Sequence, residues 1–190
     1  MSMDFTEAHM GFTVRAKILN ADDMQRALTR IAHEVIEKNK GVAGLGIIGL
    51  RSRGHHLAER LHEIISGIEK LDAPVGALDV TFYRDDVGKR LKPETFKTDI
   101  PFDVADKTII LVDDVLYTGR TVRAAMDAIM DFGRPAAIRL AVMIDRGHRE
   151  MPIKADFVGK NIPTAGKEEV RVHIKQIDNV DEVVVGEPNE

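Results

Sequence analysis

Apolar positions between residues 20 and 41 follow the repeat of a helix that buries one face. They return at spacings of four, three and four residues, at Met24, Leu28, Ile31 and Val35. Asn20 can cap the start of this helix, and Gly41 is typical of a residue just beyond a helix end. A second helix of the same kind is expected from the spacing of Leu57, Leu61, Ile64 and Ile68. Residues 1–19 give only weak signals.

Short, continuous apolar runs between these helices predict buried strands. The expected strands are at 45–50, 75–83, 108–112 and 137–144, followed by short ones at 156–158, 168–174 and 182–185. A further helix is expected at 121–131, with Gly133 and Pro135 marking its end. Helices that alternate with apolar strands are typical of an α/β fold, here with a central, mainly parallel sheet flanked by helices.

Residues 84–101 are polar and contain the charged run RDDVGKRLK, which predicts a long mobile loop or a hairpin. Loops of this length are usually functional lids or disordered segments. The sequence contains no internal repeat and no linker. We therefore expect residues 1–190 to form a single domain.

Composition narrows the class of protein and its chemistry. The chain has 190 residues, of which 44% are hydrophobic and 31% charged, as in ordinary globular proteins. It has no Cys, which excludes disulfides, thiol catalysis and thiolate metal sites. The net charge is −4, so a nucleic acid would have to meet a local basic patch. Nothing resembles a signal peptide or a membrane span, and we expect a cytoplasmic protein with no membrane partner.

The segment TIILVDDVLYTGRT at residues 108–121 has the character of a ribose 5-phosphate site. Ligands of open parallel sheets bind where strands end, and here the strand runs straight into Asp113 and Asp114, which the turn 118–121 follows. The turn opens a helix, whose unpaired N–H groups favour an anion, and Gly119 permits close approach. Carboxylates instead accept hydrogen bonds from sugar hydroxyls. The plainer alternative is an acidic strand end before a capped helix; a Walker A loop is excluded because no G-K-[ST] follows.

A second loop, GLRSRG at residues 49–54, also joins an expected strand to an expected helix. Its two arginines, serine and glycines suit a second polyanion such as pyrophosphate. Taken alone, the same residues would be equally typical of a solvated turn.

Five segments together resemble the PyrR family of type I phosphoribosyltransferases, whose members are bifunctional pyrimidine-operon attenuators and uracil phosphoribosyltransferases. The segments are ALTRIAHE (27–34), DVTFYRDD (79–86), VDDVLYTGRTVRA (112–124), DRGHRE (145–150) and GKNIPT (159–164). The resemblance extends from about Asp22 to Val185. It implies the type I phosphoribosyltransferase fold and the conversion of uracil and phosphoribosyl pyrophosphate (PRPP) to UMP and pyrophosphate. It also implies Mg²⁺, held mainly by substrate oxygens and water without direct protein ligands.

The resemblance also implies roles for particular residues. The 5-phosphate would lie at 118–121, the ribose at Asp113 and Asp114, and pyrophosphate at 51–54, in a loop that often has a non-proline cis peptide. Residues implied to bind PRPP or UMP are Arg51, Ser52, Arg53, Gly54, Asp113, Asp114, Val115, Leu116, Tyr117, Thr118, Gly119, Arg120 and Thr121. The catalytic set would be Asp113, Asp114, Arg53 and Arg84, with residues 84–101 as the lid. A hood formed mainly by 145–190 would cover the base, near Asp145, Arg146 and Val170. The family pattern has Lys-Thr-Arg-Gly where this chain has Arg51-Ser52-Arg53-Gly54.

The polar face of the first helix groups Arg26, Thr29, Arg30 and His33, because spacings of three, four and seven place side chains together. On a generic helix this would be a solvated face. The resemblance instead implies binding of pyrimidine operon leader mRNA, promoted by UMP. The implied RNA contacts are Thr29, Arg30, His33, Lys38, His148, Arg149 and Lys160. The patch has no aromatic stacking platform, and two patches for one RNA would suit a homodimer or homotetramer.

Two other functions remain open from the residues alone. The protein could be an RNA-binding regulator with weak or vestigial catalysis. It could also be a plain base-salvage phosphoribosyltransferase without RNA binding.

Overall fold

The structure is a computed structural model that describes residues 11–81 and 97–189. Its elements, in chain order, are β1 (Phe12–Leu19), α1 (Ala21–Asn39), β2 (Leu45–Leu50), α2 (Arg53–Glu69), β3 (Val75–Leu78), β4 (Thr108–Leu116), α3 (Arg120–Met130), β5 (Ala137–Asp145), β6 (Phe157–Asn161), β7 (Glu169–His173), α4 (Lys175–Asp178) and β8 (Glu182–Pro188).

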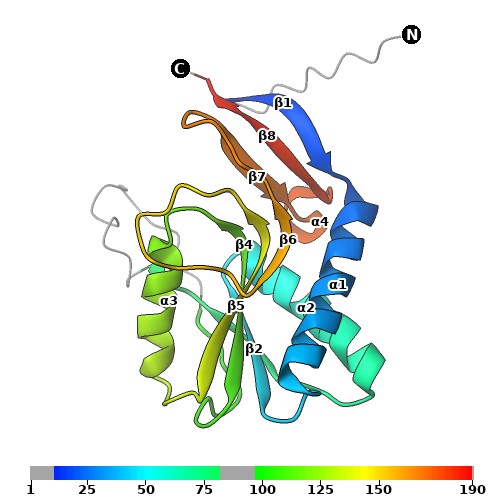
Figure 1. Cartoon of the computed structure of the whole chain (residues 1–190), viewed down its shortest axis with the longest axis vertical. Coiled ribbons are helices and arrows are strands. Elements are labelled where there is room, and N and C mark those ends of the chain that lie inside the picture. Colours follow the sequence, from blue (N-terminus) through cyan, green and yellow to red (C-terminus); the bar gives the residue numbers. More distant parts are fainter. Residues whose placement is uncertain (1–10, 82–96, 190) are drawn as a thin grey trace.

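A five-stranded parallel sheet in the order β3-β2-β4-β5-β6 forms the centre of the molecule. Helices α1 and α2 cover one face and α3 covers the other (Figure 1). Every residue of β2 is buried, which is why its apolar run is continuous. One core cluster lies beneath α1 and α2 and a second beneath α3. The predicted fold class is confirmed.

Helix α1 begins as its sequence predicts. The side chain of Asn20 accepts a hydrogen bond from the backbone N–H of Asp23 at 2.9 Å, and the Asp23 carboxylate accepts from the Asn20 N–H at 3.1 Å. This capping box satisfies two N–H groups that a helix start would leave unpaired. The helix ends at Asn39, Lys40 caps it in a left-handed conformation, and Gly41, which also has a positive φ, lies just beyond this end as the sequence predicts.

A second, antiparallel sheet in the order β1-β8-β7 lies at the upper end of the view in Figure 1, and we call it the small sheet. Strand β1 was not among the expected strands. Its pairing with β8 shifts register between Val14 and Ala16 and again between Lys17 and Leu19. These bulges break the alternation of buried and exposed positions by which a strand is recognised in sequence.

Four strand ends differ from the expectation by three residues or more, and among them β6 and β8 continue to Asn161 and Pro188 rather than to 158 and 185. Strand β3 ends at Leu78 rather than near residue 83, and Ala77 then makes an isolated antiparallel bridge with Asp99. Strand β4 continues to Leu116 because its pairing with β5 continues as far as Asp145. Residues 82–96, with Arg84 and most of the expected lid, lie outside the described residues. Across the described ranges, no helix combines the length and apolar character needed to cross a membrane.

Candidate active site at the ends of β2 and β4

Strands β2 and β4 lie side by side in parallel, in a register that pairs Leu45 with Thr108 and Gly49 with Val112. Their following helices diverge, because α2 leads outward to β3 and α3 leads the other way to β5. Such a switch of direction in a parallel sheet opens a crevice at the carboxyl ends of the two strands, where ligands bind. The two loops that the sequence identified, at 51–54 and 113–121, therefore meet at one place.

Glycines bring the two loops into direct contact. A Cβ on Gly54 would lie 2.6 Å from the carbonyl oxygen of Val112 and 3.0 Å from the Cα of Asp113. A Cβ on Gly49 would lie 2.4 Å from the Cα of His55. These distances to backbone atoms are too short for a side chain. Gly54 therefore lets α2 start against the end of β4, and Gly49 lets α2 lie against the end of β2.

The loop between β2 and α2 is fixed by hydrogen bonds of Arg51 and leaves the start of α2 without an acidic or capping side chain. The peptide bond between Arg51 and Ser52 is cis, as the resemblance implied. The Arg51 N–H donates to the carbonyl of Leu78 at 2.9 Å, and its Nε donates to the carbonyl of Lys97 at 3.1 Å. The side chain of Ser52 makes no capping hydrogen bond, and the first turn of α2 has no acidic residue. The helix start therefore keeps the positive character that attracts a polyanion.

Arg53 forms a two-pronged ion pair with Asp178, in which Nε donates to Oδ2 at 3.1 Å and Nη2 to Oδ1 at 2.7 Å. The hydrogen bond to Asp178 raises the pKa of Arg53 against the opposing effect of burial. The negative charge of Asp114 also raises the pKa of Arg53, so Arg53 lies within the field of this carboxylate at the end of β4. The sequence singled out Arg53 but not its partner.

The carboxylates of Asp113 and Asp114 are oriented by the backbone at the end of β4. Oδ1 of Asp113 accepts from the N–H of Asp114 at 2.9 Å, and Oδ1 of Asp114 accepts from the N–H of Val115 at 2.8 Å. Only 8% of Asp113 is exposed, whereas Asp114 is half-buried. Both therefore have a defined direction from which a diol could donate hydrogen bonds to them.

The turn before α3 has the geometry of a phosphate cradle. Gly119 is its N-cap with φ +91°, and a Cβ there would lie 3.1 Å from Cβ of Met151. A glycine has no capping side chain, and Oγ1 of Thr118 accepts from the N–H of Arg120 at 3.3 Å. The Arg120 side chain instead extends to Glu150, with Nε 2.5 Å from Oε2. Hydroxyls and N–H groups at the start of α3 thus favour an anion.

Asp145 and Arg146, which the sequence placed near the base, lie beside Tyr117. Tyr117 is 42% exposed, and the Arg146 guanidinium lies 4.0 Å from the centre of its ring. Arg146 is only 6% exposed and donates to Oγ1 of Thr164 at 3.2 Å and the carbonyl of Glu168 at 2.6 Å. Its guanidinium thus braces Tyr117 against the loop before β7.

Asp145 and Val170 have structural partners of their own. Asp145 pairs with Arg149 at 2.5 Å and accepts from the Gly147 N–H at 3.0 Å. Val170 is buried in the cluster beneath α1 and α2. Its strand, β7, packs against β4, which brings the small sheet over the end of the site.

The RNA candidates on α1 face the edge strand β6. Arg30 donates to the carbonyls of Val158 at 3.0 Å and Gly159 at 2.5 Å, and Lys38 pairs with Asp156 at 2.7 Å. His33 is exposed, while Thr29 is half-buried and donates to the carbonyl of Gln25 at 2.9 Å.

Lys160 on β6 lies near the start of α1. The pKa of Asp23 is lowered, first by the N–H of Asn20 and then by Arg26 and by the charge of Lys160. Lys160 thus belongs to the same side of the molecule as the α1 residues.

His148 and Arg149 lie in the connection after β5, and their contacts are with the active-site side. A His148 ring nitrogen lies 2.7 Å from the carbonyl of Thr164, and the ring meets Tyr117 edge-on at 6.4 Å. Arg149 donates to the carbonyls of Tyr117 at 2.9 Å and Ile153 at 3.0 Å. The seven RNA candidates therefore divide between the α1–β6 side and this loop.

Asp178, the partner of the candidate residue Arg53, was not singled out by the sequence. It belongs to α4, a helix of four residues that is too short for a hydrophobic repeat. In the described ranges, moreover, no group of three or more His, Asp or Glu side chains converges as a metal site would require.

Comparisons with known proteins agree on the family and the fold. The family profile of the phosphoribosyl transferase domain matches residues 15–176. The chain is 54% identical over 177 residues to the bifunctional protein PyrR of Listeria monocytogenes serotype 4b (strain CLIP80459), covering 91% of this chain and 97% of that protein. It is 55% identical over 177 residues to the bifunctional protein PyrR of Deinococcus radiodurans, covering 93% of this chain and 97% of that protein. The hypoxanthine phosphoribosyltransferase of Trypanosoma cruzi, in complex with the product IMP, superimposes with a TM-score of 0.70 at 16% identity, covering 92% of this chain and 91% of that one.

Proposed function

The chain belongs to the phosphoribosyl transferase family and, within it, to the PyrR family, and on this premise we propose that it transfers the phosphoribosyl group of PRPP to uracil. The products are UMP and pyrophosphate. The observation that carries this proposal is the meeting of two loops at the ends of β2 and β4, joined through the backbone contact at Gly54. One loop suits pyrophosphate, and the other suits a ribose with its 5-phosphate.

This reaction requires stabilisation of the charges that develop on the ribose and the pyrophosphate, and it does not require a nucleophilic side chain. As the bond between C1 of the ribose and pyrophosphate breaks, the sugar develops positive charge like that in glycoside hydrolysis. Asp113 and Asp114 stand at the ribose position and favour that charge. Arg51, Arg53 and the start of α2 favour the negative charge of the leaving pyrophosphate. We assign Arg84, which lies outside the described residues, to the lid.

We propose Mg²⁺ as the cofactor, held mainly by substrate oxygens and water. The carboxylates that the described part of the site offers are Asp113 and Asp114, and a cation that keeps several waters suits so small a set. When bound, Mg²⁺ neutralises charge on the pyrophosphate.

The base would lie beneath a hood made by the small sheet and by the loop that Arg146 braces. Asp145, Arg146 and Val170 shape this region, although Arg146 acts from behind Tyr117 because its guanidinium is engaged with the hood loop. Base selectivity then rests on the position of backbone groups in the hood.

A second function is regulation through RNA, which the α1–β6 side supports. Arg30, His33, Lys38 and Lys160 lie on that side, and the relatives are named bifunctional. We propose that this side binds the leader mRNA of a pyrimidine operon when UMP occupies the active site. A homodimer or homotetramer would present two such sides to one RNA, and the protein would act in the cytoplasm.

The direct test of the enzyme is formation of UMP from radiolabelled uracil with PRPP and Mg²⁺. Hypoxanthine is the informative competitor because the fold neighbours include hypoxanthine phosphoribosyltransferases. UMP formation with little IMP supports the proposal. Binding of PRPP without formation of UMP would leave a regulator with vestigial catalysis, and IMP in place of UMP would make the protein a salvage enzyme for another base.

The regulatory function is tested by gel shift with the leader RNA of the host's pyrimidine operon, with and without UMP. We expect UMP to strengthen the shift. Binding that UMP leaves unchanged would separate the RNA function from the active site, and no binding would favour a plain salvage enzyme.

A further inference from the structure

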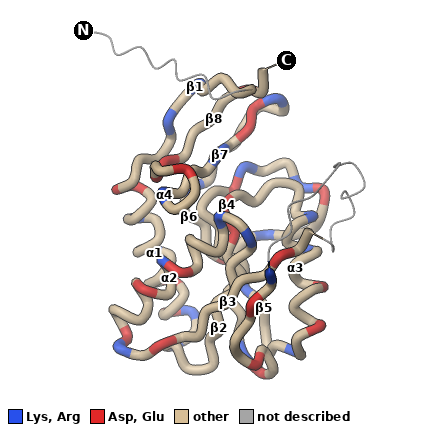
Figure 2. Tube along the Cα trace, turned by 180° about the vertical axis from the view of Figure 1, so that it is seen from behind, with Lys and Arg blue, Asp and Glu red and all other residues tan. Residues whose placement is uncertain are grey.

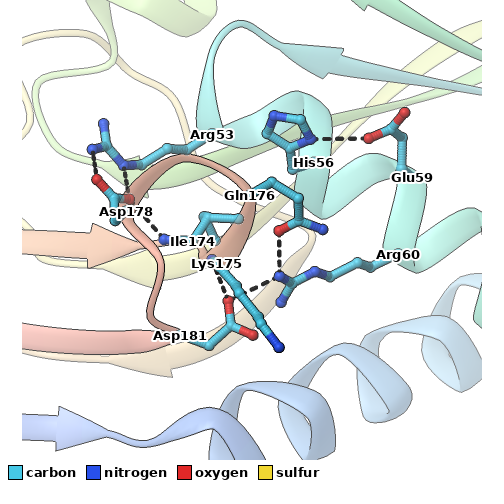
Figure 3. A network of polar contacts seen from close by, with 9 residues as sticks. All are labelled: Arg53, His56, Glu59, Arg60, Ile174, Lys175, Gln176, Asp178 and Asp181. Atoms are coloured by element: carbon cyan, nitrogen blue, oxygen red, sulfur yellow. Dashed lines mark hydrogen bonds and ion pairs between the residues drawn. The ribbon is translucent and has the colours of Figure 1, made fainter.

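Helix α4 and the turn after it are fastened to α2 by two arginine–aspartate pairs, shown in Figure 3. The first joins Arg53 to Asp178, and the second joins Nη2 of Arg60 to Oδ1 of Asp181 at 2.8 Å. Arg53 and Arg60 lie on the same helix, but only Arg53 belongs to the loop that we assign to pyrophosphate.

Asp178 is itself fixed in place. Its Oδ2 accepts from the N–H of Ile174 at 2.8 Å, at the point where β7 ends and α4 begins. Burial alone would raise the pKa of Asp178, yet the hydrogen bonds from Arg53 and Ile174 hold that pKa below its ordinary value. The carboxylate is therefore a charged anchor that connects the end of β7 to the start of α2.

We propose that Asp178 is a positioning residue for PRPP, which holds the Arg53 side chain where pyrophosphate binds. The proposal rests on the proposed function. A guanidinium has five N–H donors, and the pair with Asp178 uses two of them, so Arg53 keeps donors for an oxyanion. An arginine fixed before binding loses less conformational freedom when pyrophosphate arrives, and this strengthens binding without a new contact.

The Arg60 pair shows why the role of Asp178 differs from general fastening. Arg60 also donates to Oε1 of Gln176 at 2.5 Å, so α4 remains tied to α2 when the Asp178 pair is lost. The Asp178 pair instead lies at the first residue of α2, beside the cis peptide bond and within the field of Asp114. Loss of the Asp178 pair should therefore weaken the binding of pyrophosphate and leave the hood as a whole in place.

The test compares Asp178→Asn with the matched control Asp181→Asn in the full chain. Asparagine keeps the shape and can still accept from the N–H of Ile174, but it loses the charge that holds Arg53. We expect Asp178→Asn to raise the KM for PRPP about five- to tenfold, the size that ordering one long side chain supports. We expect the Kd for UMP to change by less than about twofold, since UMP has no pyrophosphate. Asp181→Asn should leave the KM for PRPP, the kcat and the Kd for UMP within about twofold of the wild type.

Several results would overturn the proposal. An unchanged KM for PRPP would remove the role, and a lower KM would show that Asp178 competes with pyrophosphate for Arg53. If the KM for PRPP rose equally in Asp181→Asn, both ion pairs would serve only to fasten the hood. Should Asp178→Asn fail to fold, Asp178→Glu moves the carboxylate by one methylene; a raised KM for PRPP at normal UMP affinity supports the proposal, and an unchanged KM contradicts it.

Calorimetric binding of PRPP with Mg²⁺, in the absence of any base, separates this proposal from the proposed function. If the wild type binds PRPP but forms no UMP, the assignment of uracil fails. The comparison of the two aspartate variants for PRPP binding still decides the role of Asp178.

Discussion

Asp113 and Asp114 each accept a hydrogen bond from the backbone N–H of the next residue, and an amide oxygen could accept the same bonds. The double variant Asp113→Asn with Asp114→Asn should therefore keep the fold while it loses the negative charge beside the ribose. We expect kcat to fall by about 100-fold or more, in the range seen when one electrostatic partner of a transition state is removed. The measurement is UMP formation, with circular dichroism as the check on folding.

A matched control is Asp127→Asn on α3, whose carboxylate is exposed and pairs with Arg123 at 3.3 Å. That surface pair should contribute less than about 1 kcal/mol, and kcat should stay within about twofold of the wild type. Near-normal turnover in the double variant would show that the two aspartates have no part in catalysis.

His33 and Arg30 should behave differently when each is replaced by alanine. His33 is exposed on α1, so His33→Ala should weaken RNA binding without changing the midpoint of thermal unfolding. Arg30 donates to two carbonyls of β6, so Arg30→Ala should weaken RNA binding and also lower that midpoint. Gel shifts at several salt concentrations measure the first effect, because each lost phosphate contact reduces the salt dependence of binding. If the double variant Arg30→Ala with His33→Ala binds RNA like the wild type, the α1–β6 side is not the RNA site.

At the scale of elements, the position of α2 against β4 depends on the lack of a side chain at Gly54. Gly54→Ala would place a Cβ 2.6 Å from the carbonyl oxygen of Val112, so α2 must move away from β4. We expect a loss of about 1 to 3 kcal/mol in the free energy of unfolding, as for other overpacked sites, and a large loss of activity. Denaturant unfolding and UMP formation measure the two effects.

The same helix supplies the control for that variant. A Cβ on Gly67 meets no atom within 4 Å, and the position is helical, so Gly67→Ala should stabilise the protein by up to about 1 kcal/mol and leave activity unchanged. If Gly54→Ala were as well tolerated as Gly67→Ala, the close contact between α2 and β4 would not be needed for the site.

At the scale of the whole molecule, charged pairs fasten α4 and the turn after it to α2, and join two strands of the small sheet. Basic and acidic positions are interspersed in the view of Figure 2, and the pairs include Arg53–Asp178, Arg60–Asp181 and Lys17–Glu182. Burial raises the pKa of each of these carboxyl groups, but hydrogen bonds from the basic partners and from nearby N–H or imidazole groups outweigh it and lower all three.

These lowered pKa values predict how stability depends on pH. The ordinary values are 3.8 for Asp178 and Asp181 and 4.5 for Glu182, and in the folded protein each pKa lies lower. The unfolded chain therefore binds protons more readily, and the stability that these groups contribute is present above those ordinary values. It is lost as pH falls through the folded pKa values. The midpoint of thermal unfolding should fall steeply as pH drops below about 4.5, and it should fall less steeply in Asp181→Asn. Parallel curves of midpoint against pH for the wild type and the variant would contradict this.

Local sequence determined the types of most elements, the two loops that we assign to anion binding and the two carboxylates at the end of β4. Apolar runs, helix repeats and strings such as DDVLYTGRT express local geometry, which is why they can be recognised without the fold. Strand β1 and helix α4 could not be predicted, because bulges interrupt the alternation of the first and the second is too short for a repeat.

Only the tertiary structure decided which of these parts meet. It placed β2 beside β4, so that the two loops form one crevice. It joined β1 to β8 from opposite ends of the chain, and it paired Arg53 with Asp178 across 125 positions of sequence. It also tied Arg30 to β6 and Lys38 to Asp156 just before that strand, where the helix repeat showed only a polar face. The physical reason is common to all four: strand order and long-range pairs follow from how separate elements bury their apolar faces together, and no local pattern contains that information.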